Sequence, residues 1–386
     1  MGQVALIWDP SLAAYDLGES HPLNPLRLVL TVELMEAFGL LTPDAVVSPR
    51  EATEGELLLV HASGYIEAVR QAGDWASDFR PVLGLGTEDN PVYPGMHEIA
   101  ALTCGGSIQG IEEVLSGRRK RTFSIAGGMH HAHRSRAAGF SVYNDVAVGI
   151  AVAREQRPEL KVLYVDIDAH HGDGVQEAFA GSSDVLTISI HESGVHAFPG
   201  TGFPGEIGYG AGTGFSANVP LPPQATDECF AATLDEVVVP LARAFAPDII
   251  VAQLGVDAHH LDPQTGLGLT LPGYHALVRG IITLADELCE GRLAAVGGGG
   301  YHIADVVPLA WTWVLAELSG VSLDDEVPDS WRASVGARLL CEPPRSMGAR
   351  DSLDVSAEKA DQVLALTNER ICEVRQAVFP WLGLEP

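Results

Sequence analysis

The chain has 386 residues, of which 46% are hydrophobic, and its 23 basic and 51 acidic residues give a formal net charge of −28. This charge argues against a general nucleic-acid binder, because the phosphate backbone would be repelled, although it can attract cationic ligands such as lysine-rich protein segments. The five cysteines are scattered with no CxxC spacing, which is typical of reduced thiols and predicts a cytoplasmic protein. The opening MGQVALIWDP is interpreted as a strand rather than a signal peptide, and no apolar run is long enough to predict a membrane span.

Short apolar runs alternate with helix-like stretches along the chain. The predicted strands are residues 4–8, 121–125, 161–165, 185–190, 248–253 and 293–296. The main predicted helices are residues 100–115, 147–157, 227–245 and 273–290, with a last one at 357–378. This alternation predicts an α/β domain with a central parallel sheet and helices on both faces. Residues 1–320 are expected to form the catalytic domain, and 321–386 a helical extension packed on it.

Five predicted strands are followed by unusual polar sequences. In chain order these are GGMHHAH, DIDAHHGDG, HESG, LGVDAHH and GGGGYH. Ligands of open parallel sheets bind beyond the carboxyl ends of the strands. We therefore expect these segments to meet in a single site that is rich in His, Asp and Gly.

The segment YVDIDAHHGDG suggests a metal site. Asp166, Asp168 and His170 are spaced two apart, so that in extended chain their side chains share one face, and two neighbouring members can chelate one ion. Asp257 is the best third ligand, with His259 and His260 as rivals. The alternative is a hydrogen-bonded Asp/His cluster that caps the following turn. For a metal site, the residues alone leave Zn, Fe(II), Mn and Co open.

The other strand ends can supply catalytic groups. Of the pair His130–His131, at least one imidazole is a candidate general base, and the other is a hydrogen-bond partner. Asp166 and Asp173 are suitable carboxylates to orient these rings. Tyr301, after the tetraglycine, can donate a hydrogen bond to an oxyanion, whereas a phosphate-binding role for these glycines lacks the usual following Lys.

Six motifs together resemble those of the histone deacetylase superfamily. They are GGMHHA, GFSVYND, YVDIDAHHGDGVQEAF, FPGTG, QLGVD and GGGGYH, in this order. The segments SHPLNPLRL and GLGTEDNPVYPGM are most similar to its bacterial acetoin-utilisation branch. The resemblance runs from about residue 5 to residue 320, and no motif is found beyond it.

The resemblance implies an arginase-like α/β fold and one Zn²⁺ ion held by Asp168, His170 and Asp257. It makes His131 the general base, oriented by Asp173, and His130 its electrostatic helper, oriented by Asp166. Tyr301 would bind the oxyanion. It also implies a potassium site near the zinc, formed by the residues Asp166, Asp168, His170, Ser189 and Ile190.

The same resemblance describes a substrate tunnel. Phe140 and Phe198 would form its aromatic walls, and Gly139 would offer its carbonyl to the substrate amide. Asp89 would hold the substrate backbone at the rim, and Arg27 would line an inner channel for acetate. Ser141 departs from the Cys that many relatives carry at this position, with little expected effect on the chemistry. Gln264, after Asp257, is a rim side chain whose effect on substrate choice is open.

These implications define an expected activity. The chain would be a zinc-dependent hydrolase that removes acetyl groups from the lysine side chains of proteins. The alternative substrate is a small acetylated amine, as for an acetylpolyamine amidohydrolase that shares the catalytic residues. A non-catalytic binding protein is disfavoured by the complete catalytic set, and an arginase-like ureohydrolase by the absence of a second Asp-rich cluster. The sequence leaves the physiological substrate and the oligomeric state open.

Overall fold

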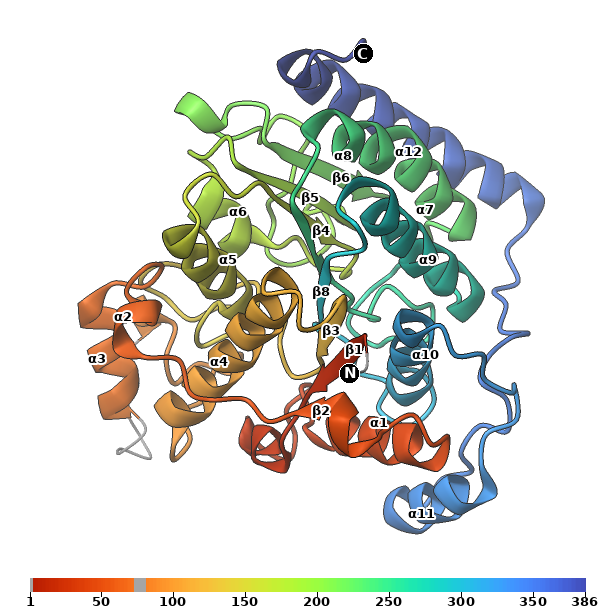
Figure 1. Cartoon of the computed structure of the whole chain (residues 1–386). Coiled ribbons are helices and arrows are strands. Elements are labelled where there is room, and N and C mark those ends of the chain that lie inside the picture. The colour runs from red at the N-terminus through yellow and green to blue at the C-terminus, as the bar shows by residue number, and fades with distance from the viewer. Residues whose placement is uncertain (1–2, 73–80) are drawn as a thin grey trace.

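The computed structural model describes residues 3–72 and 81–386. Its centre is an eight-stranded sheet in the order β2-β1-β3-β8-β7-β4-β5-β6, and every neighbouring pair is parallel (Figure 1). The strands are β1 (Val4–Ile7), β2 (Val46–Val47), β3 (Arg121–Ser124), β4 (Val162–Asp166), β5 (Val185–Glu192), β6 (Ser216–Leu221), β7 (Ile249–Gln253) and β8 (Leu293–Val296).

Helices cover both faces of this sheet, as predicted. They are α1 (Leu26–Ala37), α2 (Glu54–Leu57), α3 (Ser63–Ala72), α4 (Met96–Leu115), α5 (Asp145–Gln156), α6 (Asp173–Phe179), α7 (Asp227–Thr233), α8 (Val239–Phe245), α9 (Leu271–Leu288), α10 (Val307–Ser319), α11 (Asp329–Leu339) and α12 (Ala357–Val378). In Figure 1, α4 and α5 lie on one side of the sheet and α1, α9 and α10 on the other.

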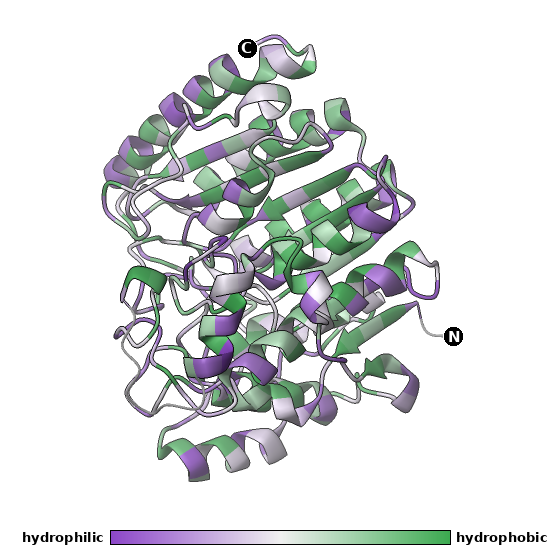
Figure 2. Cartoon of the chain, turned by 90° about the vertical axis from the view of Figure 1, so that its left-hand side faces the viewer, coloured by the Kyte–Doolittle hydropathy of each residue, from purple (hydrophilic) through white to green (hydrophobic). Residues whose placement is uncertain are grey.

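The alternation of side chains along a strand explains the two layers of core. In β4, Leu163 and Val165 belong to the larger hydrophobic cluster, whereas Val162 and Tyr164 belong to a cluster on the opposite face. All four are buried, because both faces of the sheet are covered. Figure 2 shows the same pattern, with hydrophobic residues along the strands and hydrophilic residues on the outer helices.

Six strands were predicted to within two residues at either end, and two strands were missed. The strand β6 contains Pro220 and lies at an edge of the sheet, where a missing N–H is tolerated, so its sequence lacks the usual strand pattern. The strand β2 has only two residues.

The predicted helix 227–245 is interrupted. A π-helical turn, Leu234–Val238, separates α7 from α8, and a proline follows at the start of α8. Pro240 has no N–H to continue the helical ladder, which accounts for the irregular turn before it.

The residues after α10 run along the outside of the domain. The helix α12 has the bounds predicted from the sequence and packs beside β6 and α7 (Figure 1). Five of its residues, Val363, Thr367, Ile371, Val374 and Val378, are buried. They follow a spacing of three or four residues, which places them on one helix face. The extension is therefore anchored to the domain by an apolar stripe.

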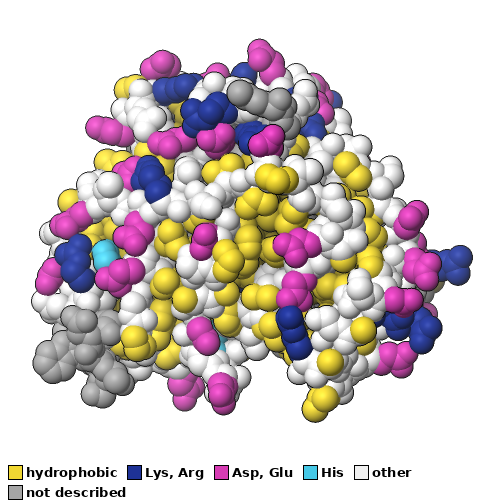
Figure 3. All heavy atoms as spheres, turned by 60° about the horizontal axis from the view of Figure 1, so that its bottom comes forward, with side chains coloured by type: hydrophobic (Ala, Val, Ile, Leu, Met, Phe, Trp, Pro, Cys, Tyr) yellow, Lys and Arg dark blue, Asp and Glu magenta, His cyan; other side chains and the backbone are white. Residues whose placement is uncertain are grey.

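The surface reflects the composition. On the face shown in Figure 3, acidic side chains are spread widely, and hydrophobic side chains are grouped near the centre. Among the described residues, no helix is long and apolar enough to cross a membrane.

Candidate functional site

Four central strands bring the polar segments together. The strands β3, β8, β7 and β4 are neighbours in the sheet although they are far apart in sequence. Their carboxyl ends lead, in the same order, to His131, Tyr301, Asp257 and Asp168. Because all strands are parallel, these residues lie at the same edge of the sheet.

Asp168, His170 and Asp257 converge at this edge. Their ligand atoms lie within 4.8 Å of one another. The Nδ1 atom of His170 is 3.3 Å from Oδ1 of Asp168 and 3.0 Å from Oδ2 of Asp257. Backbone N–H groups hold the two carboxylates in place: Gly299 donates to Asp168 at 2.6 Å, and Ala169 donates to Asp257 at 2.7 Å. These hydrogen bonds leave the carboxylates facing the imidazole.

The electrostatics of this group favour a cation. Both carboxylates are buried, with at most 1% of either residue exposed. Burial and the negative charge of Asp168 raise the pKa of Asp257 to about 6. Two buried carboxylates and one imidazole nitrogen form a donor set that suits Zn²⁺ and similar divalent ions, which would relieve this repulsion. The residues present therefore fit a divalent metal ion.

Two glycines allow the backbone to approach these carboxylates. A Cβ atom on Gly255 would lie 2.2 Å from Oδ2 of Asp168, and a Cβ atom on Gly299 would lie 2.0 Å from Oδ2 of Asp257. Both distances are far below van der Waals contact, so a larger residue at either position would displace the carboxylate. This is the structural reason for a glycine at position 255, after β7, and at position 299, after β8.

His130 and His131 form two parallel His–Asp pairs. Nδ1 of His130 is 2.8 Å from Asp166, and Nδ1 of His131 is 2.7 Å from Asp173. The two Nε2 atoms are 3.0 Å apart. The structure thus brings together the pairs expected from the sequence, with the two Nε2 atoms within hydrogen-bond distance of each other.

The pKa values of the two imidazoles move in opposite directions. Burial opposes the charged form of His130, but the carboxylates of Asp166 and Asp168 outweigh it and raise its pKa to about 9. Burial and the positive charge of His130 lower the pKa of His131 to about 4, in spite of Asp173. A neutral His131 beside a cationic His130 is suited to accept a proton.

A third histidine in this network was missed by sequence analysis. His133 contacts Glu177 through Nδ1, and its Nε2 atom is 3.3 Å from the carboxylate of Asp173. These contacts raise the pKa of His133 to about 9. The cation therefore shares Asp173 with His131. The motif HHAH contained the signal, since alternate residues after a strand can share a face.

Tyr301 is positioned through its backbone. Its N–H donates to Asp262 at 2.7 Å. The preceding turn is held by buried Arg27, which donates to the carbonyls of Gly298 and Gly300 at 2.8 and 3.1 Å. Burial, together with the carboxylates of Asp257 and Asp168, raises the pKa of the Tyr301 phenol, so it remains a hydrogen-bond donor at neutral pH. No motif or spacing in the sequence indicates the contact between Asp262 and Tyr301.

His131, His170 and Tyr301 line one cavity of about 130 Å³. Its walls are Asp89, His131, Gly139, Phe140, His170, Phe198, Gln264 and Tyr301. The ring of Phe198 lies 4.9 Å from that of His131, and the ring of Phe140 lies 5.8 Å from that of Tyr301, measured between centroids. All four residues expected around the tunnel are thus brought to one opening, together with the rim residue Gln264.

The remaining histidines lie outside this cavity. His259 and His260, the rival ligands, point instead to Asp351. Ser189 contacts Nδ1 of His191 through its hydroxyl, at 2.8 Å. The structure therefore groups Asp257, and not its histidine neighbours, with Asp168 and His170.

Residues 21–318 match the model of the histone deacetylase domain. The chain belongs to the histone deacetylase family, and within it to the branch of the acetoin utilisation proteins. It is 42% identical over 333 residues to the acetoin utilisation protein AcuC of Bacillus subtilis strain 168, which covers 86% of both chains. It is 38% identical over 341 residues to AcuC of Staphylococcus xylosus, covering 88% of both.

Solved structures of the family share the fold. A histone deacetylase homologue from Aquifex aeolicus superposes with a TM-score of 0.82 at 31% identity. A histone deacetylase homologue in complex with SAHA gives 0.83 at 30% identity, and each match covers 95% of this chain and 99% of the other. The resemblance recognised in the sequence motifs and the expected arginase-like and deacetylase-like fold are confirmed.

Proposed function

We propose that the chain is a zinc-dependent cytoplasmic deacetylase that hydrolyses N-acetyl-lysine side chains of proteins to lysine and acetate. The observation that carries this proposal is the shared cavity: His131 and Tyr301 line it together with His170, which belongs to the group Asp168, His170 and Asp257. A general base, an oxyanion donor and a divalent-metal donor set within one narrow cavity are the components of amide hydrolysis. Membership of the histone deacetylase family supports acetyl as the acyl group that is transferred to water.

The residues of the chain divide the reaction between them. When bound by Asp168, His170 and Asp257, Zn²⁺ supplies Lewis-acid polarisation of the acyl carbonyl and lowers the pKa of water. Nε2 of His131 takes the proton of the attacking water, while Asp173 holds the opposite side of the ring. The Tyr301 phenol donates a hydrogen bond to the oxyanion as the carbonyl carbon becomes tetrahedral.

Collapse of the tetrahedral species breaks the carbon–nitrogen bond. His131 returns the proton to the leaving amine, so that water and the amide give acetate and the free lysine amine. His130 stays positively charged beside this proton transfer, because the carboxylate of Asp166 contacts its Nδ1 atom and raises its pKa. The cation favours the neutral state of His131 before the reaction.

The shape of the cavity supports an unbranched substrate stem. Phe140 and Phe198 provide aromatic walls, and Gly139 between them leaves no side chain in the opening. Phe198 is 44% exposed, which places it at the mouth of the cavity. Asp89, also at the cavity, suits contact with the N–H groups of a peptide backbone. The potassium site near Asp166 and Ser189 stays a prediction.

The test is steady-state turnover on two substrates by the metal-loaded full chain. An acetyl-lysine peptide and acetylspermidine are compared, each with and without a chelator. We expect a larger kcat/KM for the peptide, loss of activity with chelator, and recovery on addition of Zn²⁺. Preference for acetylspermidine would instead establish an acetylpolyamine amidohydrolase, and chelator-resistant turnover would contradict the metal-dependent mechanism.

A further inference from the structure

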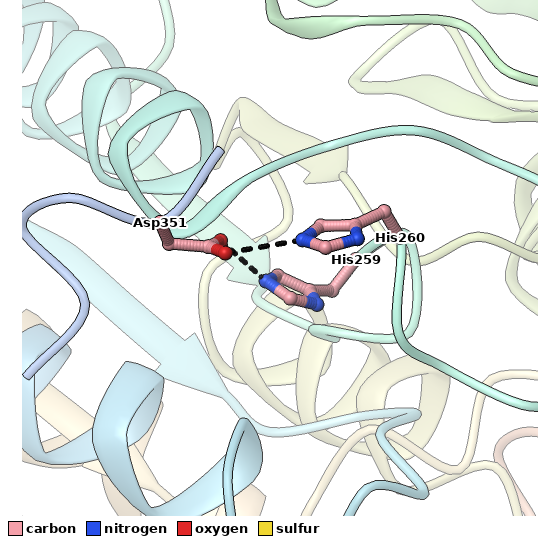
Figure 4. A group of neighbouring side chains, drawn as sticks. All are labelled: His259, His260 and Asp351. Atoms are coloured by element: carbon pink, nitrogen blue, oxygen red, sulfur yellow. Dashed lines mark hydrogen bonds and ion pairs between the residues drawn. The ribbon is translucent and has the colours of Figure 1, made fainter. Parts of the chain in front are cut away.

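A cluster outside the cavity joins the C-terminal extension to the site. Nε2 of His259 lies 2.8 Å from Oδ2 of Asp351, and Nε2 of His260 lies 3.1 Å from Oδ1 (Figure 4). The two histidines follow the strand β7, whereas Asp351 lies between α11 and α12. Asp351 and His259 are 92 residues apart in sequence.

Asp351 contacts the loop between β7 and α9 at two places. Besides the two histidines, its carboxylate accepts a hydrogen bond at 2.9 Å from the backbone N–H of Leu271, the first residue of α9. The loop between β7 and α9 contains Asp257, Asp262 and Gln264. One carboxylate therefore fixes the segment between His259 and Leu271, which carries Asp262 and Gln264 and begins two residues after Asp257.

The extension fits closely against this loop. Gly348 has a φ of +92°, and a Cβ atom on it would lie 2.2 Å from Cδ1 of Leu271. The N–H of Asp351 donates to the carbonyl of Gly348 at 2.9 Å, which closes a turn around the carboxylate. Met347 beside them is buried in the main core. Asp351 is thus held by a rigid turn.

Hydrogen bonding, rather than a metal, accounts for the cluster. The N–H of Leu261 donates to Nδ1 of His259 at 3.2 Å, so the proton of the neutral ring is on Nε2 and points to Asp351. A metal on this Nε2 would require the opposite tautomer and would break the contact with Leu261. Three N–H donors meet two carboxylate oxygens, and both oxygens are satisfied.

We propose that Asp351 is a positioning residue for the candidate site, acting through the loop between β7 and α9. Through this loop it orients Asp257 in the metal group, and through Asp262 it orients Tyr301. Outer partners of this kind influence metal affinity and turnover when they fix the residues that touch the metal and the substrate. The effect on turnover rests on the proposed function, whereas the effect on the metal group does not.

The experiment compares Asp351→Asn with Asp354→Asn in the full chain. Asn has nearly the same shape as Asp, but it replaces one carboxylate oxygen with an NH₂ group, which cannot accept from these donors. Asp354 is exposed on the same segment and provides the matched control. We expect Asp351→Asn to lower kcat by about tenfold or more and to weaken Co²⁺ binding by a similar factor. The visible absorption of bound Co²⁺ should also change, and Asp354→Asn should leave all three values as in the parent.

Two other outcomes would overturn or replace the positioning role of Asp351. A lower melting temperature with unchanged kcat, Co²⁺ affinity and Co²⁺ spectrum would show a merely structural role and overturn the proposal. Two Co²⁺ ions per chain, with one lost in Asp351→Asn, would replace it with a second metal site. If the parent protein does not deacetylate, the Co²⁺ affinity and the Co²⁺ spectrum still test whether Asp351 positions the metal group.

If Asp351→Asn does not fold, the variant His260→Ala tests the same proposal. His260→Ala removes one of the three hydrogen bonds to Asp351, and the backbone bond from His260 to the carbonyl of Leu269 remains. We expect the same changes in kcat and Co²⁺ affinity, but smaller. Parent values for both in a folded His260→Ala protein would contradict the proposal.

Discussion

The Nε2 atoms of His130 and His131 lie 3.0 Å apart, while their Nδ1 atoms face two different carboxylates. If both Nδ1 atoms carry protons, only one of the Nε2 atoms can donate across this gap. In the metal-free protein, the pKa directions assign the donor as cationic His130 and the acceptor as neutral His131. His131 has a single Nε2 lone pair, so it gives up this hydrogen bond when it takes the proton of the attacking water. Two chemically identical neighbours thereby acquire different roles from their surroundings.

The metal-free protein should show this division directly. Because its pKa is lowered to about 4, His131 should stay neutral until the pH falls to that value. Because its pKa is raised to about 9, His130 should stay protonated until the pH rises to that value. Nitrogen chemical shifts of the imidazoles, followed by NMR from pH 4 to 9, measure both. Two rings that titrate together near pH 6.5 would refute the assignment.

Asp257→Ala should abolish metal loading. The substitution removes one of the two carboxylates that face His170, and the remaining pair is a weak chelate. Elemental analysis after dialysis against Zn²⁺ should find close to one ion in the parent and almost none in the variant. The exposed Asp235 provides a matched control, since Asp235→Ala should bind zinc like the parent. Zinc retained by folded Asp257→Ala would remove this residue from the ligand set.

Tyr301→Phe should fold normally and lose about two to three decades of kcat with little change in KM. The phenol is expected to contact only the oxyanion, so its removal affects the transition state more than the bound substrate. Tyr209→Phe is the control, because Tyr209 is 67% exposed and lies outside the cavity lining. Full turnover of an acetyl-lysine peptide by Tyr301→Phe would exclude the oxyanion role.

The central strands and the groups at their ends were predictable from the sequence for a physical reason. A buried parallel strand such as β4 is uncharged up to its last residue, Asp166, so the polar residues that follow it, Asp168 and His170, stand out. Because neighbouring strands of a parallel sheet end at the same edge, the residues that follow them come together, and no further motif is needed to predict this. Asp257 could be proposed from its position after β7, but its preference over His259 came only from the family resemblance.

The partners of these groups could not be predicted in this way. Asp262 reaches Tyr301, and Asp351 reaches His259, across long separations in sequence that depend on how the loops and the extension pack. No periodicity identifies such contacts, because a single Asp in a loop resembles any other solvated carboxylate. The edge strand β6 was not predicted for a related reason: its proline is tolerated because the strand lies at the edge of the sheet, a position that the sequence pattern does not reveal.

His133 should make stability depend on pH. Its pKa is raised from about 6.5 in the unfolded chain to about 9 in the folded one, by Asp173 and Glu177. The stabilisation is therefore complete below pH 6.5 and is lost as the pH rises through 9. Urea unfolding at pH 6 and pH 9 should show that the excess stability of the parent over His133→Gln decreases by on the order of 1 kcal/mol. An excess that does not change with pH would contradict this linkage.

Gly139→Ala should damage the site without affecting the metal. Gly139 has a φ of +50°, and a Cβ atom on it would lie 2.4 Å from Cδ2 of His131 and 2.8 Å from Cε1 of Phe198. One of these rings must move, and a shift of about 1 Å in a catalytic group can reduce turnover by about a hundredfold. We expect kcat/KM to fall by about that factor, while the zinc content stays equal to that of the parent protein.

Gly64→Ala is the control, because a Cβ atom at this position contacts nothing within 4 Å. Because Gly64 lies in helix α3, Ala should preserve activity and raise the free energy of unfolding by about 0.5–1 kcal/mol. Equal activity of the two alanine variants would show that the tunnel tolerates a side chain at position 139.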